Sequence, residues 1–273
     1  MNLIPHSKPY ISPKDIASVL EVLNSRFIGR CEKTKELEDK ISKATNARNV
    51  VCVGSGRSAI ASACQILRLK KVFVPTYSCD DLIDAPLWAG TAPIPYDIDQ
   101  EVTEAAIVVH GPIKVHVPRG TKVIHDFANV FPKNFDLVDD IAIFSFGPLK
   151  PITGGHGGAI AYNFPLNRDK LSNLSPTSDI NSALTLSQLK REKPVKRYLT
   201  VESFEDCQND FFKQGILVRH ETGGLVHRML KLKDKDFPNA VKRWNTIVSV
   251  PNYPDLTLEE RHRIDHACRR YSV

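Results

Sequence analysis

One lysine stands out as the residue of this sequence with the clearest chemistry. Lys150 lies in SFGPLKPITGGHGG, after the apolar run DIAIFSF and before a stretch of glycines. A phosphate-binding P-loop has its glycines before the lysine, so the order here excludes that motif. A lysine amine at the end of a buried strand can instead condense with an aldehyde. The segment therefore predicts Schiff-base chemistry of the kind used by pyridoxal phosphate (PLP) enzymes.

A PLP cofactor would need two further kinds of residue. A carboxylate must keep the pyridine nitrogen protonated, and amides or hydroxyls must hold the phosphate. Asp126 ends the apolar run KVIHD and is the candidate carboxylate, although an aspartate at a strand end is also typical of a turn. The candidates for the phosphate lie at a predicted helix start and near the lysine: Gly56, Arg57, Ser58 and Ser145.

The same helix start fits a second kind of site. The segment GSGRSA matches the dinucleotide-binding pattern G-x-G-x-x-G/A, and Asp80 and Asp81 follow at a distance suited to a ribose contact. A Rossmann reductase is therefore an alternative. Two predicted helices precede the segment, whereas a Rossmann domain commonly opens with this motif.

Several elements must position these residues. Short apolar runs alternate with helical patterns: VVCV, VFVP, APIPYDID, AAIVVHG, KVIHDFA and DIAIFSF. This alternation predicts a mostly parallel sheet covered by helices on both faces. Ligands of such sheets bind at the carboxyl ends of the strands. We therefore expect residues 54–58, 76–79, 126–129 and 145–150 to be neighbours.

The C-terminal third has a different pattern. Helical signals replace strand signals after Tyr162, and Thr257 and Glu260 have capping-box spacing before the last helix. We predict a large α/β domain over residues 1–170 and a small α+β domain over residues 171–273.

The composition limits the class of protein. The chain has 273 residues, a net charge of +6 and six scattered cysteines without a C-x-x-C pair. It has no apolar stretch of about 20 residues that could span a membrane, and no secretory signal. These features favour a cytoplasmic protein with free thiols, no metal site, and no nucleic-acid or membrane partner.

A family resemblance is carried by seven segments, which occur in this order: GSGRSAI, PTYS, APIPYDID, VIHDFAN, SFGPLKPITGGHGG, SALTLSQL and FPNAVKRWNTIVSVPNYPDLT. They resemble the DegT/DnrJ/StrS family of PLP-dependent sugar aminotransferases, and the lysine segment is the most specific of them. The resemblance implies a shortened member with PLP-dependent transferase fold type I, a mostly parallel central sheet flanked by helices, and a reduced C-terminal α+β domain.

The resemblance also implies residue roles. Lys150 would form the internal aldimine and carry the transferred proton, Asp126 would pair with the pyridine nitrogen, and Asn129 would reach the phenolic oxygen. The phosphate would be held by Gly56, Arg57 and Ser145. The implied reaction moves an amino group from an amino acid such as glutamate to a keto-sugar, typically nucleotide-linked, in a homodimer with a shared active site.

The sequence departs from the family pattern at several positions. Cys79 stands where the family has an aromatic residue stacked on the cofactor ring, and Tyr77 is the nearest substitute. His156 replaces a glutamate in the glycine-rich tail, and His125 replaces one before Asp126. Gly29 matches a glycine near the family's substrate site, or simply ends a helix. Tyr77, His156 and Gly29 are the candidate substrate residues.

These departures leave other functions open. A PLP enzyme of another reaction type, elimination or decarboxylation, is one alternative, and a non-catalytic relative is another. The retention of both Lys150 and Asp126 speaks against the latter.

Overall fold

The computed structural model describes residues 2–111, 121–165, 176–191 and 196–271, and divides into two compact units. The larger unit contains Ile11–Pro75 and Asp81–Arg191, and the smaller unit contains Met1–Tyr10, Thr76–Asp80 and Glu192–Val273. The division near Arg191 comes later in the chain than the predicted residue 170. The reason is that helix α6 (Asp179–Leu189) packs against α1 (Pro13–Ser25) and α2 (Glu32–Thr45) of the larger unit.

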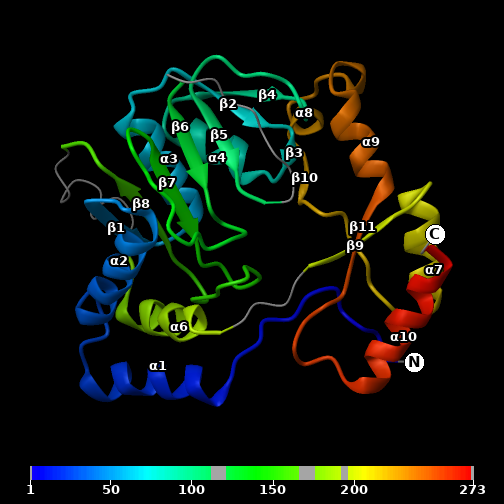
Figure 1. Ribbon diagram of the computed structural model, residues 1–273, viewed down its shortest axis with the longest axis horizontal. Coiled ribbons are helices and arrows are strands. Elements are labelled where there is room, and N and C mark those ends of the chain that lie inside the picture. The colour runs from blue at the N-terminus through cyan, green and yellow to red at the C-terminus, as the bar shows by residue number, and fades with distance from the viewer. Residues whose placement is uncertain (1, 112–120, 166–175, 192–195, 272–273) are drawn as a thin grey trace. The chain divides into compact units, whose positions relative to one another are not determined.

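A seven-stranded sheet forms the centre of the larger unit (Figure 1). Its strand order is β1-β8-β7-β6-β5-β2-β4. Five strands, from β7 to β4, pair in parallel, whereas β8 pairs antiparallel with both β7 and β1. The strands are β1 (Asn49–Val53), β2 (Lys71–Pro75), β4 (Ala92–Tyr96), β5 (Ala106–Val109), β6 (Val123–Asp126), β7 (Ile141–Ser145) and β8 (Gly158–Tyr162).

The two faces of this sheet are covered by different helices. Side chains alternate between the faces along each strand. Ala142 and Phe144 of β7 belong to a core cluster that includes Leu37 and Ile41 of α2. On the same strand, Ser145 points to the other face, where α3 (Gly56–Ile66) packs on β7 and β8 and on α4 (Asp81–Trp88). The helix start predicted to bind phosphate therefore lies at the end of β7.

Two buried aspartates fix the helices at the base of the larger unit. The Asp179 carboxylate at the start of α6 accepts the N–H groups of Cys31, Lys33 and Thr34 at 2.8, 2.9 and 2.9 Å, which caps the start of α2. Asp15 of α1 makes an ion pair of 3.0 Å with Arg191, just beyond α6. These contacts explain why α6 belongs to the larger unit.

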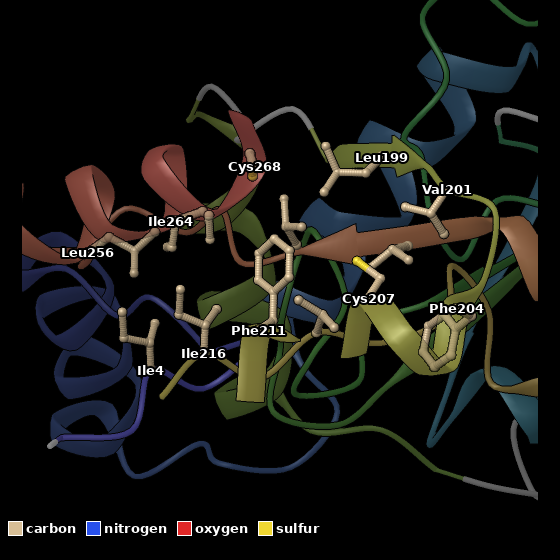
Figure 2. Packing of buried hydrophobic residues seen from close by; sticks show 14 of the residues in the cluster. Ile4, Leu199, Val201, Phe204, Cys207, Phe211, Ile216, Leu256, Ile264 and Cys268 are labelled. Carbon is tan, nitrogen blue, oxygen red and sulfur yellow. The ribbon is translucent and has the colours of Figure 1, made fainter. Parts of the chain in front are cut away.

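Among its described residues, the smaller unit contains two short antiparallel sheets of two strands each and four α-helices (Figure 1). Strand β3 (Tyr77–Ser78) pairs with β10 (Gly224–Leu225), and β9 (Arg197–Thr200) pairs with β11 (Ile247–Val250). The helices are α7 (Phe204–Lys213), α8 (Val226–Met229), α9 (Pro238–Thr246) and α10 (Leu258–Cys268). Figure 2 shows the core of this unit, where Phe211 lies among Ile216, Cys207 and Ile264.

Most of the predicted elements are present. The strands before Lys150, the helices at both ends of the chain and the Thr257–Glu260 capping box are confirmed. Strand β8 lies within the glycine-tail region and was not predicted. None of the helices among the described residues is long and apolar enough to cross a membrane.

Candidate active site

Lys150 lies in a tight turn directly after β7. Its N–H donates to the carbonyl of Gly147 at 3.1 Å, which closes the turn. A Cβ on Gly147 would lie 3.8 Å from Lys150 Cγ and 3.9 Å from Ser145 Oγ, so the lysine stem folds back over the turn. The residue is half-buried, and its ammonium makes no hydrogen bond or ion pair with a described residue. The amine is therefore available for chemistry.

Asp126 provides a buried carboxylate at the end of β6. Its side chain accepts the Ala128 N–H at 2.8 Å, and the residue is only 6% exposed. Burial raises the pKa of the Asp126 carboxyl, while the Ala128 amide and the positive charge of Lys150 act in the opposite direction. A buried carboxylate whose pKa is raised by burial is suited to bind a further cationic N–H group.

The start of α3 is pressed against the end of β7. A Cβ on Gly56 would lie 2.6 Å from Ser145 Cβ and 2.8 Å from Ser145 Oγ, so only glycine fits here without a shift. Ser55 caps the helix by accepting the Ser58 N–H at 3.0 Å, and its hydroxyl bonds that of Ser58 at 2.9 Å. The Ser145 hydroxyl thus lies beside the positive end of a helix, which is a favourable place for a phosphate.

The glycines after Lys150 bring the chain back to this helix start. Phe146 and Gly157 bond through their backbones at 2.9 Å, and Gly157 forms a bridge with Ser55. A Cβ on Gly158 would lie 2.5 Å from the Ser55 carbonyl oxygen, which leaves no room for a side chain. The glycine-rich tail therefore permits close packing of three segments rather than forming a loose loop.

Arg57 is held by α4. Its guanidinium pairs with Asp81 through Nε, lies 3.3 Å from Asp84 through Nη1, and packs over the Trp88 ring at 5.2 Å. In this structure the Arg57 guanidinium is therefore engaged by side chains of α4. The contribution of Arg57 to a phosphate site would come from its position at the helix start.

The other sequence candidates are distributed over both units. Asn129 lies half-buried in the turn after Asp126, and His156 is exposed in the glycine-rich tail. Gly29 is exposed in the loop between α1 and α2, where its carbonyl accepts the Asp179 N–H at 2.6 Å. Tyr77 and Cys79 belong to the smaller unit, so their predicted place beside the cofactor ring stays a prediction.

Sequence reasoning missed a histidine chain on the other face of the sheet. His110, directly after β5, bonds His125 ring to ring at 2.9 Å, and His125 lies 3.4 Å from Asp140. Burial, and to a smaller degree His125, lowers the pKa of His110 to about 4. The backbone N–H of His110 donates to the Asp126 carbonyl at 2.8 Å. The contacts of His110, His125 and Asp140 thus stabilise β6, the strand that carries Asp126. No sequence signal for them exists, because the three residues come from separate segments.

The geometry fits a PLP-type site better than a dinucleotide site. Lys150, Asp126, Ser145 and Gly56 lie in one unit, with the three polar groups at the carboxyl ends of β6 and β7. In a Rossmann fold the glycine motif follows a central strand. Here it follows β1, which is an edge strand paired antiparallel with β8. Among the described residues, no group of His, Cys, Asp and Glu could hold a metal ion.

The family model of the DegT/DnrJ/EryC1/StrS aminotransferase family matches residues 9–125. This match, over fewer than half of the residues, supports the predicted resemblance to that family and the expected class of enzyme, a PLP-dependent aminotransferase. The match ends just before Asp126, so the roles of the residues from Asp126 to Lys150 depend on the geometry described above.

Solved structures of aminotransferases share the fold. The PLP form of Spr1654 from Streptococcus pneumoniae, described as a sugar aminotransferase, is 17% identical, with a TM-score of 0.79 over 100% of each chain. Helicobacter pylori PseC, described as an aminotransferase of pseudoaminic acid biosynthesis, is 17% identical, with a TM-score of 0.80 over 99% of each chain. TlmJ from Streptoalloteichus hindustanus is 15% identical, with a TM-score of 0.82 over 98% of each chain. These similarities confirm the predicted fold.

Proposed function

We propose that this protein is a PLP-dependent aminotransferase that acts on a keto-sugar and uses Lys150 as its catalytic amine. The observation that carries the proposal is the arrangement of Lys150, the buried Asp126 carboxylate, and the Gly56–Ser145 contact within one unit. Each matches one demand of the cofactor: an amine for its aldehyde, a carboxylate for its pyridine nitrogen, and a helix start for its phosphate.

Each residue of the site would have its own role in amino transfer. When bound, PLP supplies an aldehyde and an electron-accepting ring. Ser145 and the start of α3 hold the phosphate, and Asn129 lies in the turn beside Asp126. Asp126 would hold the proton on the pyridine nitrogen, and its carboxylate would be stabilised by that neighbouring positive charge. The Nζ atom of Lys150 accepts and returns the proton that moves during amino transfer.

The substrate class is inferred from the relatives. Spr1654 is described as a sugar aminotransferase and has been solved in PLP and pyridoxamine phosphate forms, and PseC is described as an enzyme of pseudoaminic acid biosynthesis. We extend the sugar substrate to this chain, with a nucleotide-linked keto-sugar as acceptor and an amino acid such as glutamate as donor. A cytoplasmic location is part of the same proposal.

A homodimer is supported by an exposed apolar stripe on α1. Ile16, Leu20 and Leu23 follow helical spacing and are 53%, 49% and 45% exposed. Phe27 and Ile28 extend the stripe into the next loop and are exposed as well. An apolar surface of this kind marks a protein interface, and the partner implied by the family resemblance is a second copy of the chain.

The function is tested by the visible spectrum of the protein with PLP. The wild type should take up PLP and show the absorption band of the lysine-bound cofactor, and Lys150→Ala should lose that band. Addition of glutamate or another amino donor should then convert the cofactor to pyridoxamine phosphate. A wild type that does not take up PLP would refute the proposal. Uptake of PLP without conversion by any common amino acid would favour elimination or decarboxylation instead.

A further inference from the structure

His110 contacts three consecutive residues of the chain, and Asp126 is the middle one. The Nε2 atom of its ring lies 2.9 Å from Nδ1 of His125. Its backbone N–H donates to the Asp126 carbonyl at 2.8 Å. Its ring stacks on that of Phe127, with 4.1 Å between the ring centres and 15° between the planes. One residue at the end of β5 therefore holds Asp126 and both of its neighbours, and all four residues belong to the larger unit.

The direction of the Asp126 carboxylate depends on this stretch of backbone. Within the described part of the chain, the carboxylate has one hydrogen-bond partner, the Ala128 N–H at 2.8 Å. Ala128 belongs to the same segment, so this bond moves with the backbone rather than fixing it. The Phe127 N–H donates to the Ile143 carbonyl of β7 at 2.9 Å. The segment is thus held by β7 on one side and by His110, after β5, on the other, as the order of these strands shows (Figure 1).

The hydrogen bonds of the two histidine rings run in one direction. The Asp140 carboxylate lies 3.4 Å from His125 Nε2 and accepts the Val123 N–H at 2.8 Å. Although burial acts to raise the pKa of the Asp140 carboxyl, the hydrogen bonds from His125 and Val123 lower it below its usual value. A carboxylate only accepts, so a neutral His125 ring carries its proton on Nε2. Its Nδ1 atom then accepts a hydrogen bond from His110 Nε2–H.

We propose that His110 is a positioning residue that directs the Asp126 carboxylate toward the pyridine nitrogen of the cofactor. It acts by fixing the peptide units on both sides of Asp126, and it takes part in the reaction only through that residue. The proposal rests on the proposed function and deepens it, because it names the residue that supports the cofactor's carboxylate.

The Ala128 N–H reports the position of the Asp126 carboxylate directly, because it donates to Asp126 Oδ1. Its hydrogen exchange can be followed by NMR in the full chain without PLP. His110→Phe retains a ring over Phe127 but loses the donor to His125, so the Ala128 N–H should exchange about ten-fold faster. His110→Gln supplies an amide N–H in place of Nε2–H and should restore most of the protection.

Phe135 provides a matched control in the same aromatic cluster. Its ring contacts those of His110, His125 and Phe127 edge-on, with 5.7, 4.9 and 5.0 Å between ring centres. Its own N–H donates to the Ala44 carbonyl, away from the Asp126 segment. Phe135→Leu should therefore lower the midpoint of thermal unfolding but leave the exchange of the Ala128 N–H unchanged. Unchanged exchange in His110→Phe, or equally fast exchange in Phe135→Leu, would overturn the proposal.

A double-mutant cycle with Asp126 tests whether His110 acts through that carboxylate. His110→Phe should slow the conversion of bound PLP by the amino donor about ten-fold at saturating donor, without changing the donor KM. In the Asp126→Asn background the same substitution should have almost no further effect, because the carboxylate that it positions is gone. Losses that multiply would show that His110 acts independently of Asp126, and would overturn the proposal.

The wild type alone provides a further test that requires no variant to fold. At about pH 8, where both rings are neutral, the nitrogen chemical shifts of His110 and His125 should show the proton on Nε2 in each. A proton on Nδ1 of His125 would overturn the proposed chain of hydrogen bonds.

These measurements separate the positioning role from the proposed function. If the wild type does not take up PLP, the proposed function fails, while the exchange of the Ala128 N–H without PLP still shows whether His110 holds Asp126. If PLP uptake and donor conversion are intact but His110→Phe leaves that exchange unchanged, only the positioning role fails.

Discussion

The contact between Gly56 and Ser145 leads to the sharpest prediction about the site. In Gly56→Ala the new Cβ would lie 2.6 Å from Ser145 Cβ, 2.8 Å from Ser145 Oγ and 3.3 Å from Ser145 Cα. An ordinary carbon contact is about 3.5–4.0 Å, so α3 and β7 must separate by about 1 Å. Overpacking of this kind typically costs about 1–3 kcal/mol of folding free energy.

That cost has two measurable consequences. For a chain of this size, the midpoint of thermal unfolding should fall by about 2–4 °C for each kcal/mol, measured without PLP. Because the phosphate is proposed to bind between the start of α3 and Ser145, a 1 Å displacement should also weaken PLP binding by about 10²-fold. PLP affinity is measured by absorbance titration of the protein freed of cofactor.

A control and a rescue distinguish this contact from a general effect of alanine. A Cβ on Gly111 would meet nothing within 4 Å, so Gly111→Ala should leave both quantities nearly unchanged. Ser145→Gly removes the two closest atoms, and Gly56→Ala combined with Ser145→Gly should regain most of the lost stability. PLP affinity should stay low, because the double variant lacks the Ser145 hydroxyl. Equal stability of Gly56→Ala and Gly111→Ala, or no rescue, would refute the reasoning.

Four further predictions follow from the structure. Asp126→Asn keeps the shape but removes the charge, and should slow amino transfer by about 10²-fold while PLP still binds; an unchanged rate would contradict the role of Asp126. Arg57→Ala should change PLP affinity far less than Gly56→Ala, because its guanidinium is engaged by Asp81 and Asp84; an equal loss in titration would show that Arg57 grips the phosphate. The pKa of His110 is lowered to about 4, so between pH 6.5 and 4 the unfolded state binds a proton that the folded state does not. The free energy of unfolding should therefore decrease as the pH falls through this range. His110→Phe should reduce the slope of that free energy against pH by about 1.4 kcal/mol per pH unit, the value for one proton, as measured by urea unfolding at several pH values. Leu20→Glu introduces a charge into the exposed stripe of α1 and should convert a dimer to a monomer in light scattering, whereas Lys14→Glu should not.

The parts of the site that depend on local sequence could be predicted. The apolar run before Lys150 and the glycines after it place the lysine at a strand end, and GSGRS marks a helix start by turn chemistry alone. The alternation of strands and helices is likewise a local signal, and the predicted mostly parallel sheet is present.

The parts that depend on pairing between distant segments could not be predicted. Nothing in the sequence couples Arg57 to Asp81 or His110 to His125, because each pair comes from different elements. The assignment of Thr76–Asp80 to the smaller unit depends on the pairing of β3 with β10, a contact between two-residue strands with no periodic signal. The same long-range pairing brings Tyr77 to Glu221 and Arg243, a contact for which the sequence carries no local signal.

The central claim is that Lys150 is the amine that bonds the cofactor. The most direct measurement is to load the wild type with PLP, reduce it with borohydride, digest it and locate the pyridoxyl mass by peptide mass spectrometry. We expect the modification on the peptide that contains Lys150, and its loss in Lys150→Ala. Stoichiometric labelling of another lysine, or labelling that persists in Lys150→Ala, would contradict the account.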